Sequence, residues 1–362
     1  NPVHELAAKQ ILEAEHPELL VTASCEVLPE VREYERTSTT VVNAYILPAM
    51  RVYLSRLQRD LAAIGVRAPI QVMASHGGMI GLTAASHKPV FAVASGPAGG
   101  VTGVARLGEV TGDRDAIVFD MGGTTAKAAI VTDGLPAVTN EYEFRDGISA
   151  PSRFVKGGGY VLKVPAIDIA EVGAGGGSVA RVDAGGLLHV GPESVGAAPG
   201  PACYGLGNDR PTVTDANMVL GYLNPVALAG GSLRVDPARS HEAIRRYVAE
   251  PLGLDVVAAA HGIRELANVN MARAIRAVTV ERGRDPRDLT LVAFGGGGPV
   301  HAVAVARQLA ITRIVAPVMA GVFCSAGMLA ALPSHELVRA VLKPLAGCTP
   351  QEVGRFAADL AE

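Results

Sequence analysis

The sequence predicts an α/β fold in which a mixed β-sheet is flanked by helices. Residues 116–131 contain two apolar runs separated by a glycine turn, which indicates an antiparallel strand pair. Residues 289–315 carry a strand, a helix and a strand pattern in succession, which predicts two parallel strands. Residues 256–281 carry apolar side chains at helical spacing, which predicts a long amphipathic helix.

The composition is that of a globular protein without a strong charge bias. Of the 362 residues, 49% are hydrophobic and 19% are charged, and the formal net charge is −3. This length is enough for two domains. Because there is no basic excess, we expect neither nucleic acid nor an anionic membrane surface as a partner. The 4 cysteines lack metal-ligand spacing and are interpreted as reduced thiols of a cytoplasmic protein.

The first third of the chain is expected to form helices joined by short strands. The helices are predicted at residues 3–15, 43–64 and 95–107, and the strands at residues 70–73 and 90–93. The second helix has one apolar face, made by Leu47, Met50, Leu54, Leu57, Leu61 and Ile64. Ser95 and Pro97 are typical of a helix start. The chain begins at Asn1 without a signal-peptide pattern, as the interior of a longer protein would.

The middle of the chain combines a predicted meander with a long glycine-rich stretch. Asp133-Gly134 is a hairpin signal, so we expect a third antiparallel strand within residues 137–144. Residues 151–215 are rich in glycine and proline, and a loop of this length is usually functional or disordered. A strand pattern at Val161–Val164 interrupts it, which favours a functional loop.

The C-terminal third carries the crossover unit. The helix at 256–281 is expected to end at a cap on Gly283, and the strand at 289–294 leads into a helix at 300–309 and a strand at 311–315. Residues 314–334 are uncharged and long enough to span a bilayer. Because prolines and glycines interrupt this run, we interpret it as a strand, a turn and a short buried helix.

The segment from Phe119 to Lys127 has the features of a phosphate-binding hairpin. Gly122 and Gly123 stand at the bend between two strands, where backbone N–H groups can converge on a phosphate without Cβ atoms in the way. Thr124 and Thr125 add hydroxyl groups, and Asp120 at the strand end can hold Mg²⁺ through water. Lys127 would lie near the phosphates or face solvent. The alternative is an ordinary glycine hairpin with a solvated aspartate.

A second glycine run lies between a predicted strand and a predicted helix. Gly295, Gly296, Gly297 and Gly298 precede Pro299 and His301, so N–H groups and the helix dipole would lie at the carboxyl end of the sheet. Close packing of the strand against the helix is the alternative explanation. The spacing fits neither the dinucleotide fingerprint nor the P-loop. His301 is a candidate catalyst, although a hydrogen-bonded histidine at a helix start is the commoner case.

Several other side chains are candidates for acid–base chemistry. Asp168 and Glu171 precede the glycine loop at residues 173–178, where they would line a site or remain surface carboxylates. Asp215 is either catalytic or part of the cap of a helix that begins near Ala216. Cys203 lies between proline and glycine bends without a sign of reactivity, and we interpret His76 and His87 as loop residues.

These motifs, taken in order, resemble a known family. An Asp-x-Gly-Gly-Thr hairpin followed by a glycine-rich strand-to-helix loop resembles the actin, Hsp70 and sugar-kinase ATPase superfamily, whose fold is ribonuclease H-like. The narrower resemblance is to the hydantoinase A/5-oxoprolinase family, which includes acetone and acetophenone carboxylase subunits. The motifs that carry it lie at residues 95–100, 119–127, 172–178, 199–205, 211–216 and 294–301.

The resemblance implies an ATP-dependent hydrolase that opens cyclic amides of the hydantoin or 5-oxoproline type. In such a reaction ATP phosphorylates the amide carbonyl oxygen, and water then opens the ring. From the candidates above, we select Asp120, which would also bind Mg²⁺, Asp215 and His301 as the predicted catalytic residues. The implied ATP-binding residues are Gly122, Gly123, Thr124, Thr125, Lys127 and Gly295–Gly298. Relatives act beside a second large subunit, hydantoinase B-like, or as homo-oligomers.

The resemblance also implies that part of the ATP cleft is missing. Family members begin with a domain that carries its own phosphate hairpin, and this chain has no such segment. We therefore expect residues 1–95 to be a remnant of the first actin-like domain, 96–330 the second, and 331–362 the start of a further segment. By the same resemblance, the helix after Gly96 and the segment from Gly321 to Ala331 would connect the two domains.

The substrate is not determined by the sequence. Many 5-oxoprolinase-like members carry Ser-Thr-Asp after Gly-Gly-Thr, whereas this chain has Thr125-Ala126-Lys127. That difference is closer to hydantoinases and ketone carboxylases. A subunit of an ATP-dependent ketone carboxylase is therefore an alternative, and a binding or assembly module that is inactive alone is another.

Overall fold

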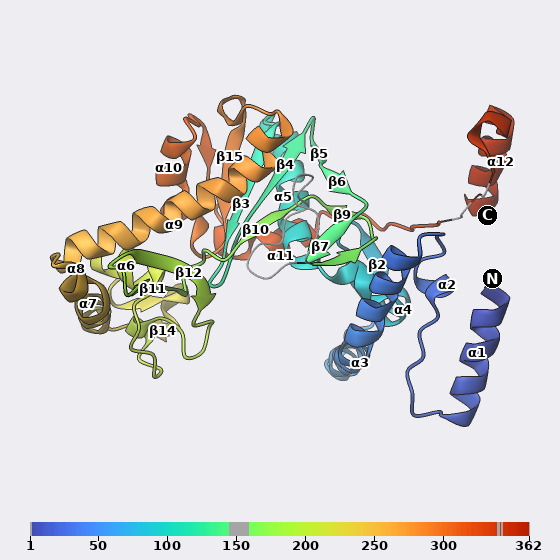
Figure 1. Cartoon of the computed structure of the whole chain (residues 1–362), viewed down its shortest axis with the longest axis horizontal. Helices are drawn as coiled ribbons and strands as arrows, with labels where there is room; N and C mark the ends of the chain where they lie inside the picture. The colour runs from blue at the N-terminus through green and yellow to red at the C-terminus, as the bar shows by residue number, and fades with distance from the viewer. Residues whose placement is uncertain (1, 145–158, 339–340, 342, 362) are drawn as a thin grey trace.

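The computed structural model describes residues 2–144, 159–338, 341 and 343–361. One mixed sheet occupies the centre of the molecule, with helices on both faces (Figure 1). Its strand order is β10-β4-β3-β15-β16, and β5 pairs with β4 beside this path. Helices α1 to α4 lie at one end of the molecule, and α6 to α8 lie at the other (Figure 1). The predicted α/β class with a mixed sheet is confirmed.

The central strands match the apolar runs of the sequence. β3 (Ala116–Met121) and β4 (Ala126–Thr132) are antiparallel, with Asp120 opposite Lys127. β15 (Thr290–Phe294) runs parallel to β3 on one side and to β16 (Ile314–Val315) on the other. All five residues of β15 are buried, as expected for a parallel strand covered on both faces. The predicted crossover unit is therefore confirmed.

The predicted three-stranded meander is wrong beyond its second strand. β5 (Leu135–Pro136) pairs with β4 over two residues only. One further backbone hydrogen bond, from the Ala137 N–H to the Ile130 carbonyl at 3.0 Å, follows this pair before the chain leaves β4. β6 (Val138–Thr139) and β7 (Tyr142–Phe144) instead pair with β9 (Ala166–Ile167) and β8 (Tyr160–Leu162). β10 (Ala170–Val172) takes the place beside β4.

Two helical layers cover the sheet, and alternation along β3 decides which layer each side chain meets. α9 (Val256–Val278) and α10 (Gly298–Gln308) cover one face, where Ile117, Phe119 and Met121 are buried. α5 (Ser95–Thr111) and α11 (Phe323–Met328) cover the other face, together with Val118. Since alternate residues of a strand share a face, Asp120 points to the side of α5 and α11.

The N-terminal end is mainly helical. Its elements are α1 (Pro2–Glu15), α2 (Ser24–Val27), α3 (Glu33–Ala63), β1 (Gln71–Met73), β2 (Met79–Gly81), α4 (Leu82–His87) and the 3₁₀ turn η1 (Pro89–Ala92). α3 begins ten residues before the predicted start. The sequence pattern missed these first turns because they are mostly polar and do not extend the apolar face from which the helix was predicted. The strand predicted at 90–93 is instead η1, whose first residue, Pro89, sets a helical φ.

The glycine-rich stretch is ordered wherever the structure describes it; residues 151–158 lie outside the described residues. The strand predicted at 161–164 is observed as β8, at Tyr160–Leu162. The elements that follow are β11 (Ser178–Val182), β12 (Leu188–Ser194), η2 (Ala202–Tyr204), α6 (Val213–Val219), β13 (Ala227–Leu228), η3 (Ala229–Gly231), β14 (Leu233–Arg234), α7 (Pro237–Ile244), the π-turn η4 (Arg245–Ala249) and α8 (Glu250–Leu252).

The remaining elements complete the C-terminal third. They are η5 (Val280–Arg282), η6 (Pro286–Asp288), η7 (Ala320–Val322), η8 (Leu345–Gly347) and α12 (Pro350–Ala361). α9 ends at Val278, and Gly283, with a φ of 73°, ends η5 rather than the long helix. The uncharged run at 314–334 contains β16, η7 and α11, as predicted. Within the described ranges, none of the helices is long and apolar enough to span a bilayer.

Candidate functional site

The turn between β3 and β4 presents backbone donors to the surface. Gly122, Gly123 and Thr124 are exposed, and the Gly122 N–H donates to the Thr125 carbonyl at 3.1 Å. In the described part of the chain, the N–H groups of Gly123, Thr124 and Thr125 have no acceptor. A Cβ added to Gly122 or Gly123 would meet nothing within 4 Å, and neither residue has a positive φ. The fold therefore does not require glycine at these two positions, and the space in front of them is open.

The glycine loop at residues 173–178 supports this turn from behind. The Gly176 and Gly177 N–H groups donate to the Gly122 and Gly123 carbonyls at 3.1 and 2.5 Å. A Cβ on Gly175 would lie 2.4 Å from the carbonyl carbon of Thr124, so the two backbones touch. The loop thus packs against the hairpin and hydrogen-bonds to the carbonyl groups of Gly122 and Gly123. The N–H groups of the hairpin turn are not used by this contact.

Three charged side chains form a row across neighbouring strands below the turn. Asp120 on β3 faces Lys127 on β4, and Lys127 faces Glu171 on β10. The Lys127 ammonium lies 3.3 Å from a Glu171 carboxylate oxygen and donates to the Thr125 hydroxyl at 2.7 Å. Lys127 is therefore held within the site, with a side-chain exposure of 21%. Glu171, a weaker sequence candidate, joins the site because β10 pairs with β4.

Asp120 lies in a less favourable environment than the other two charges. Burial raises the pKa of its carboxyl group, and the nearby Lys127 charge only partly counteracts this. Its described hydrogen-bond partner is the Cys324 thiol of α11, with Sγ 3.7 Å from Oδ2. The same carboxylate and burial raise the pKa of Cys324 to about 12, so that thiol stays protonated. The sequence offered no signal for this contact, since Cys324 lies 204 residues away.

In the second glycine run, Gly295, Gly297 and Gly298 pack closely against neighbouring atoms, whereas Gly296 does not. A Cβ on Gly295, whose φ is 81°, would lie 2.4 Å from the Met121 carbonyl oxygen. The Gly297 N–H donates to that oxygen at 2.9 Å, and Gly298 is buried against Phe119. Gly296 has nothing within 4 Å of its Cβ position. The run therefore fits α10 tightly against β3, and Gly296 is the member left facing open space beside Asp120.

His301 is fully buried rather than exposed to a cleft. Its ring lies between Asn268, with Nδ1 2.7 Å from Oδ1, and Asn217, whose amide nitrogen is 2.9 Å from Nε2. Burial, together with the charge of Arg264, lowers the pKa of His301 to about 3. The imidazole is thus neutral and links α6, α9 and α10. We therefore propose that His301 positions helices and does not exchange protons with a substrate.

This burial predicts a specific acid sensitivity. The pKa of His301 falls from 6.5 to about 3 on folding, so between these pH values the unfolded chain binds a proton that the folded protein does not. The contribution of the neutral imidazole to stability is therefore complete above pH 6.5 and is lost as the pH falls toward 3. In denaturant titrations, the wild type should lose up to roughly 4 kcal/mol over this range relative to His301→Gln. If the two proteins lose stability in parallel over this range, His301 is accessible to protons in the folded state.

Asp215, the next predicted catalytic residue, is buried and surrounded by hydrogen-bond donors. Its carboxylate accepts hydrogen bonds from the N–H groups of Ala202, Cys203 and Thr212 and from the hydroxyls of Thr212 and Ser240, at 2.6–3.1 Å. It forms a capping box with Thr212 at the start of α6. We therefore propose that Asp215 fixes the loop at residues 199–205. Burial and Asp215 raise the pKa of Cys203 to about 12, which argues against a reactive thiol.

The remaining candidates lie elsewhere. Asp168 forms an ion pair with Arg282, with Oδ1 2.8 Å from Nη2. His76 accepts from the Gly78 N–H at 3.1 Å in the β1–β2 turn, and burial lowers its pKa. His87 is the last residue of α4. Within the described ranges, no cluster of three or more His, Cys, Asp or Glu side chains is arranged to hold a metal ion.

Comparisons with known proteins agree with the motifs. The hydantoinase/oxoprolinase family model matches residues 36–337. An uncharacterized protein of Methanocaldococcus jannaschii is 44% identical over 100% of this chain and 53% of its own length. The α subunit of caprolactamase from Pseudomonas jessenii is 40% identical over 91% of this chain and 45% of its own length.

Structural similarity points the same way. A nucleotide-free structure of acetone carboxylase matches with a TM-score of 0.79 and 32% identity, over 91% of this chain and 45% of that chain. The chain thus spans about half the length of the relatives it matches. The order of the glycine motifs, the mixed sheet that carries them and these similarities place the chain in the hydantoinase/oxoprolinase family.

Proposed function

We propose that the protein containing this chain is an ATP-dependent hydrolase that opens cyclic amides. The observation that carries the proposal is the β3–β4 turn. Its glycines are not required by the fold, and three of its N–H groups have no acceptor among the residues that the structure describes. Such a turn is an anion-binding concavity. The family assignment and the similarity to a caprolactamase subunit support phosphate as the anion and a lactam or imide as the substrate.

In the proposed reaction the amide oxygen attacks the γ-phosphorus of ATP and ADP leaves. Water then adds to the activated carbon, the C–N bond breaks to give a free amine and an acyl phosphate, and a second water hydrolyses the acyl phosphate to a carboxylate and phosphate. Gly123, Thr124 and Thr125 would bind the phosphate oxygens, and Lys127 would neutralise part of their charge. Glu171 and Thr125 hold the Lys127 ammonium in place, which keeps it oriented before substrate arrives.

Asp120 is the residue we propose for Mg²⁺. A single carboxylate fits this ion only together with water and phosphate oxygens, which is how Mg²⁺ usually binds beside nucleotides. Asp120 suits such a role because, among the described residues, its partly buried carboxylate forms no ion pair, and the charge of Lys127 on the next strand only partly offsets its burial. Bound Mg²⁺ would neutralise phosphate charge, and Asp120 would orient the ion's water ligands.

We further propose that this chain supplies one side of an actin-like cleft. Residues 1–95 would belong to the first domain, 96–330 to the second and 331–362 to a further segment. The contact between α5 and α11 supports this proposal, since it brings together the two segments expected to connect the domains. The other phosphate hairpin, and a second large subunit or another copy, would complete the enzyme.

A ketone carboxylase subunit is the second candidate function. The TM-score of 0.79 to acetone carboxylase supports it, just as the TM-score of 0.71 at 39% identity to a caprolactamase structure supports the first. Assays of the full-length protein with its partner subunit should separate the two. Cyclic amidohydrolysis of hydantoin, 5-oxoproline or caprolactam requires ATP but not bicarbonate, whereas carboxylation of acetone requires both. ATP- and bicarbonate-dependent carboxylation of acetone, with no hydrolysis of any of the three cyclic amides, would overturn the hydrolase assignment.

The phosphate role of the turn has its own test. Gly123→Ala should fold as well as the wild type, because its Cβ meets nothing within 4 Å. We expect at least roughly tenfold weaker ATP binding in calorimetric titrations of the full-length protein, since the methyl group would enter the phosphate space. Gly354→Ala in α12, which also meets nothing within 4 Å, is the matched control. Unchanged ATP affinity of Gly123→Ala would contradict the proposal.

A further inference from the structure

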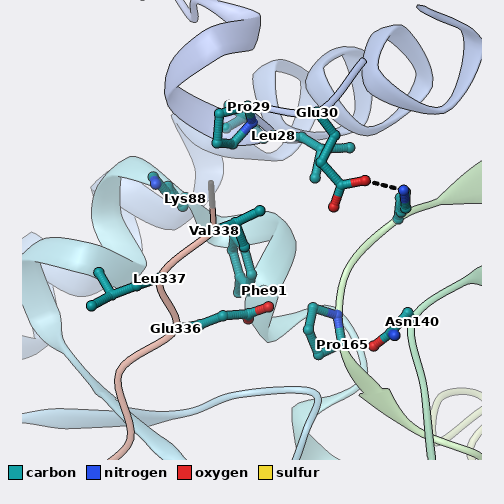
Figure 2. A pocket seen from close by; sticks show the side chains of 12 residues that line it. Leu28, Pro29, Glu30, Lys88, Phe91, Asn140, Pro165, Glu336, Leu337 and Val338 are labelled. Atoms are coloured by element: carbon teal, nitrogen blue, oxygen red, sulfur yellow. Dashed lines mark hydrogen bonds and ion pairs between the residues drawn. The ribbon is translucent and has the colours of Figure 1, made fainter. Parts of the chain in front are cut away.

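A cavity of about 450 Å³ lies away from the phosphate turn, at the end of the molecule that holds α2 and α4 (Figures 1 and 2). Its walls come from five parts of the chain. They are residues 27–30 at the end of α2, residues 88–91 at η1, Asn140 between β6 and β7, residues 163–165 between β8 and β9, and the extended segment at residues 336–338. The volume is within the range of small-molecule sites. Residues 332–334 hold the extended segment through backbone hydrogen bonds with Met79, at 2.9 Å each.

Part of the wall is apolar and rests on a buried cluster. Val27 and Leu28 are 3% and 4% exposed, and Phe91 packs against the same small core. Pro165 and Val338 add apolar surface across the cavity (Figure 2). This surface suits an aliphatic chain, because burying methylene groups against it removes them from water.

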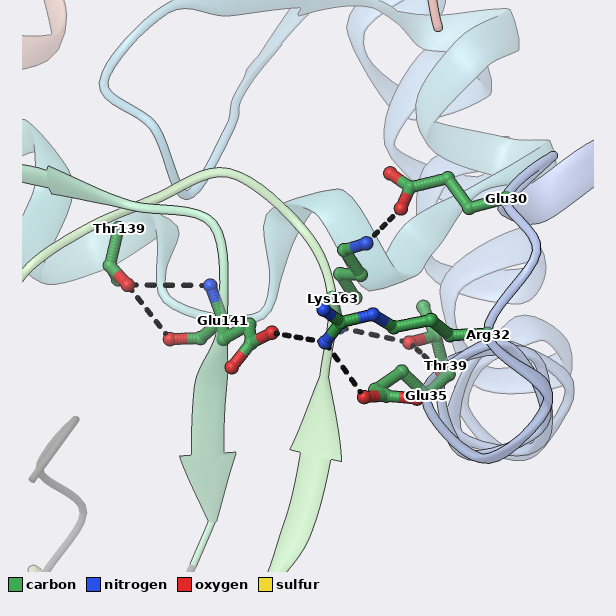
Figure 3. Close-up of polar contacts among 7 residues, drawn as sticks. All are labelled: Glu30, Arg32, Glu35, Thr39, Thr139, Glu141 and Lys163. Carbon is green, nitrogen blue, oxygen red and sulfur yellow. Dashed lines mark hydrogen bonds and ion pairs between the residues drawn. The ribbon is translucent and has the colours of Figure 1, made fainter. Parts of the chain in front are cut away.

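One charged wall is already neutralised within the protein. Lys163 forms an ion pair with Glu30, and its backbone N–H donates to the Thr39 hydroxyl at 3.0 Å (Figure 3). Arg32 lies beside this pair, 3.3 Å from Glu35 and 3.7 Å from Glu141. These contacts tie the start of α3 to the β6–β9 region. They leave little free charge on this wall for a ligand.

Two further charged side chains line the cavity, Glu336 and Lys88. Among the described residues, neither Glu336 nor Lys88 takes part in an ion pair or a side-chain hydrogen bond. Figure 2 shows Glu336 reaching from the extended segment toward Phe91 and Pro165. Burial raises the pKa of Glu336, and the Lys88 charge works against this rise. The cavity wall therefore offers the carboxylate of the exposed residue Glu336 and the ammonium group of the half-buried Lys88, which form no ion pair with each other in the described structure.

We propose that this cavity binds a small aliphatic ω-amino acid, with its ammonium on Glu336, its carboxylate on Lys88 and its methylene chain on Leu28, Phe91 and Pro165. A ligand with opposite charges at two separated ends matches two unpaired protein charges that do not touch. A plain fatty acid or a plain amine would satisfy one of them only. The site is separate from the phosphate turn and does not depend on the proposed hydrolase function.

The test is ligand binding to the full-length protein without ATP or a cyclic amide. The probes are 4-aminobutanoate, 6-aminohexanoate and 8-aminooctanoate, with hexanoate and hexylamine as singly charged comparisons. At least one ω-amino acid should bind at least roughly tenfold more tightly than either comparison in calorimetric or NMR titrations. It should also slow hydrogen exchange of the amides at residues 334–338.

Glu336→Gln and Lys88→Met should each weaken this binding roughly tenfold, because each removes one charged partner. Glu193→Gln, which removes a carboxylate that pairs with Arg210 on β12, is the matched control and should bind like the wild type. Absence of binding by all three ω-amino acids would overturn the proposal. So would equal binding of hexanoate or hexylamine, or wild-type affinity in both charge variants.

Discussion

Replacing Gly327 with alanine is expected to cost roughly 3 kcal/mol of unfolding free energy. The reason is the crossing of α5 and α11, where the two backbones touch. A Cβ on Gly327 would lie 1.9 Å from the Gly99 carbonyl oxygen and 2.8 Å from the Gly103 nitrogen. Both obstacles are backbone atoms of a buried helix, so no side chain can rotate away and the helices would have to separate.

Chemical denaturation of the full-length protein measures this effect, and the same helix supplies the control. Gly96 lies in α5, the helix that Gly327 of α11 contacts, but a Cβ on Gly96 meets nothing within 4 Å. Gly96→Ala should leave stability unchanged or slightly higher, because alanine favours helix more than glycine does. Equal stability of the two alanine variants would mean that the helices do not cross as closely as described.

Asp120→Asn is expected to lower ATP hydrolysis by at least roughly 100-fold while leaving the protein as stable or more stable. The folded state raises the pKa of Asp120, so the ionised carboxylate opposes folding at every pH above its unfolded pKa. Asparagine keeps the shape and removes that cost. The loss of activity would follow from the missing negative charge that we propose for Mg²⁺.

Steady-state ATPase assays and denaturation curves of the same preparations test both parts of this prediction. Asp133→Asn makes the same change at the opposite end of the strand pair, in the turn between β4 and β5. Asparagine tolerates the φ of 51° at that position, so this control should keep its activity. Wild-type ATP hydrolysis by Asp120→Asn would remove Asp120 from the proposed mechanism. A large loss of stability would contradict the described environment of its carboxyl group.

The sequence by itself determined the central strands, the long helix and the positions of the glycine turns. These features are local: apolar runs predict β3, β4 and β15, and helical spacing predicts α9. The motif order was also enough to indicate the family. Local patterns failed where pairing was decided at a distance. Nothing near residues 137–144 indicates that this segment leaves β4 and that β10 replaces it.

The surroundings of each candidate residue depend on contacts that form only in the folded chain. Glu171 reaches Lys127 because β10 lies beside β4, and Cys324 reaches Asp120 because α11 packs on that face. The glycines look alike in sequence, yet Gly175 and Gly295 are required by backbone contacts, whereas Gly123 and Gly296 face open space. His301 and Asp215 are polar residues in motifs, and their burial and hydrogen bonds support the structural roles that we propose for them. Burial, pairing and free space depend on residues far away in the chain, and no sequence window contains them.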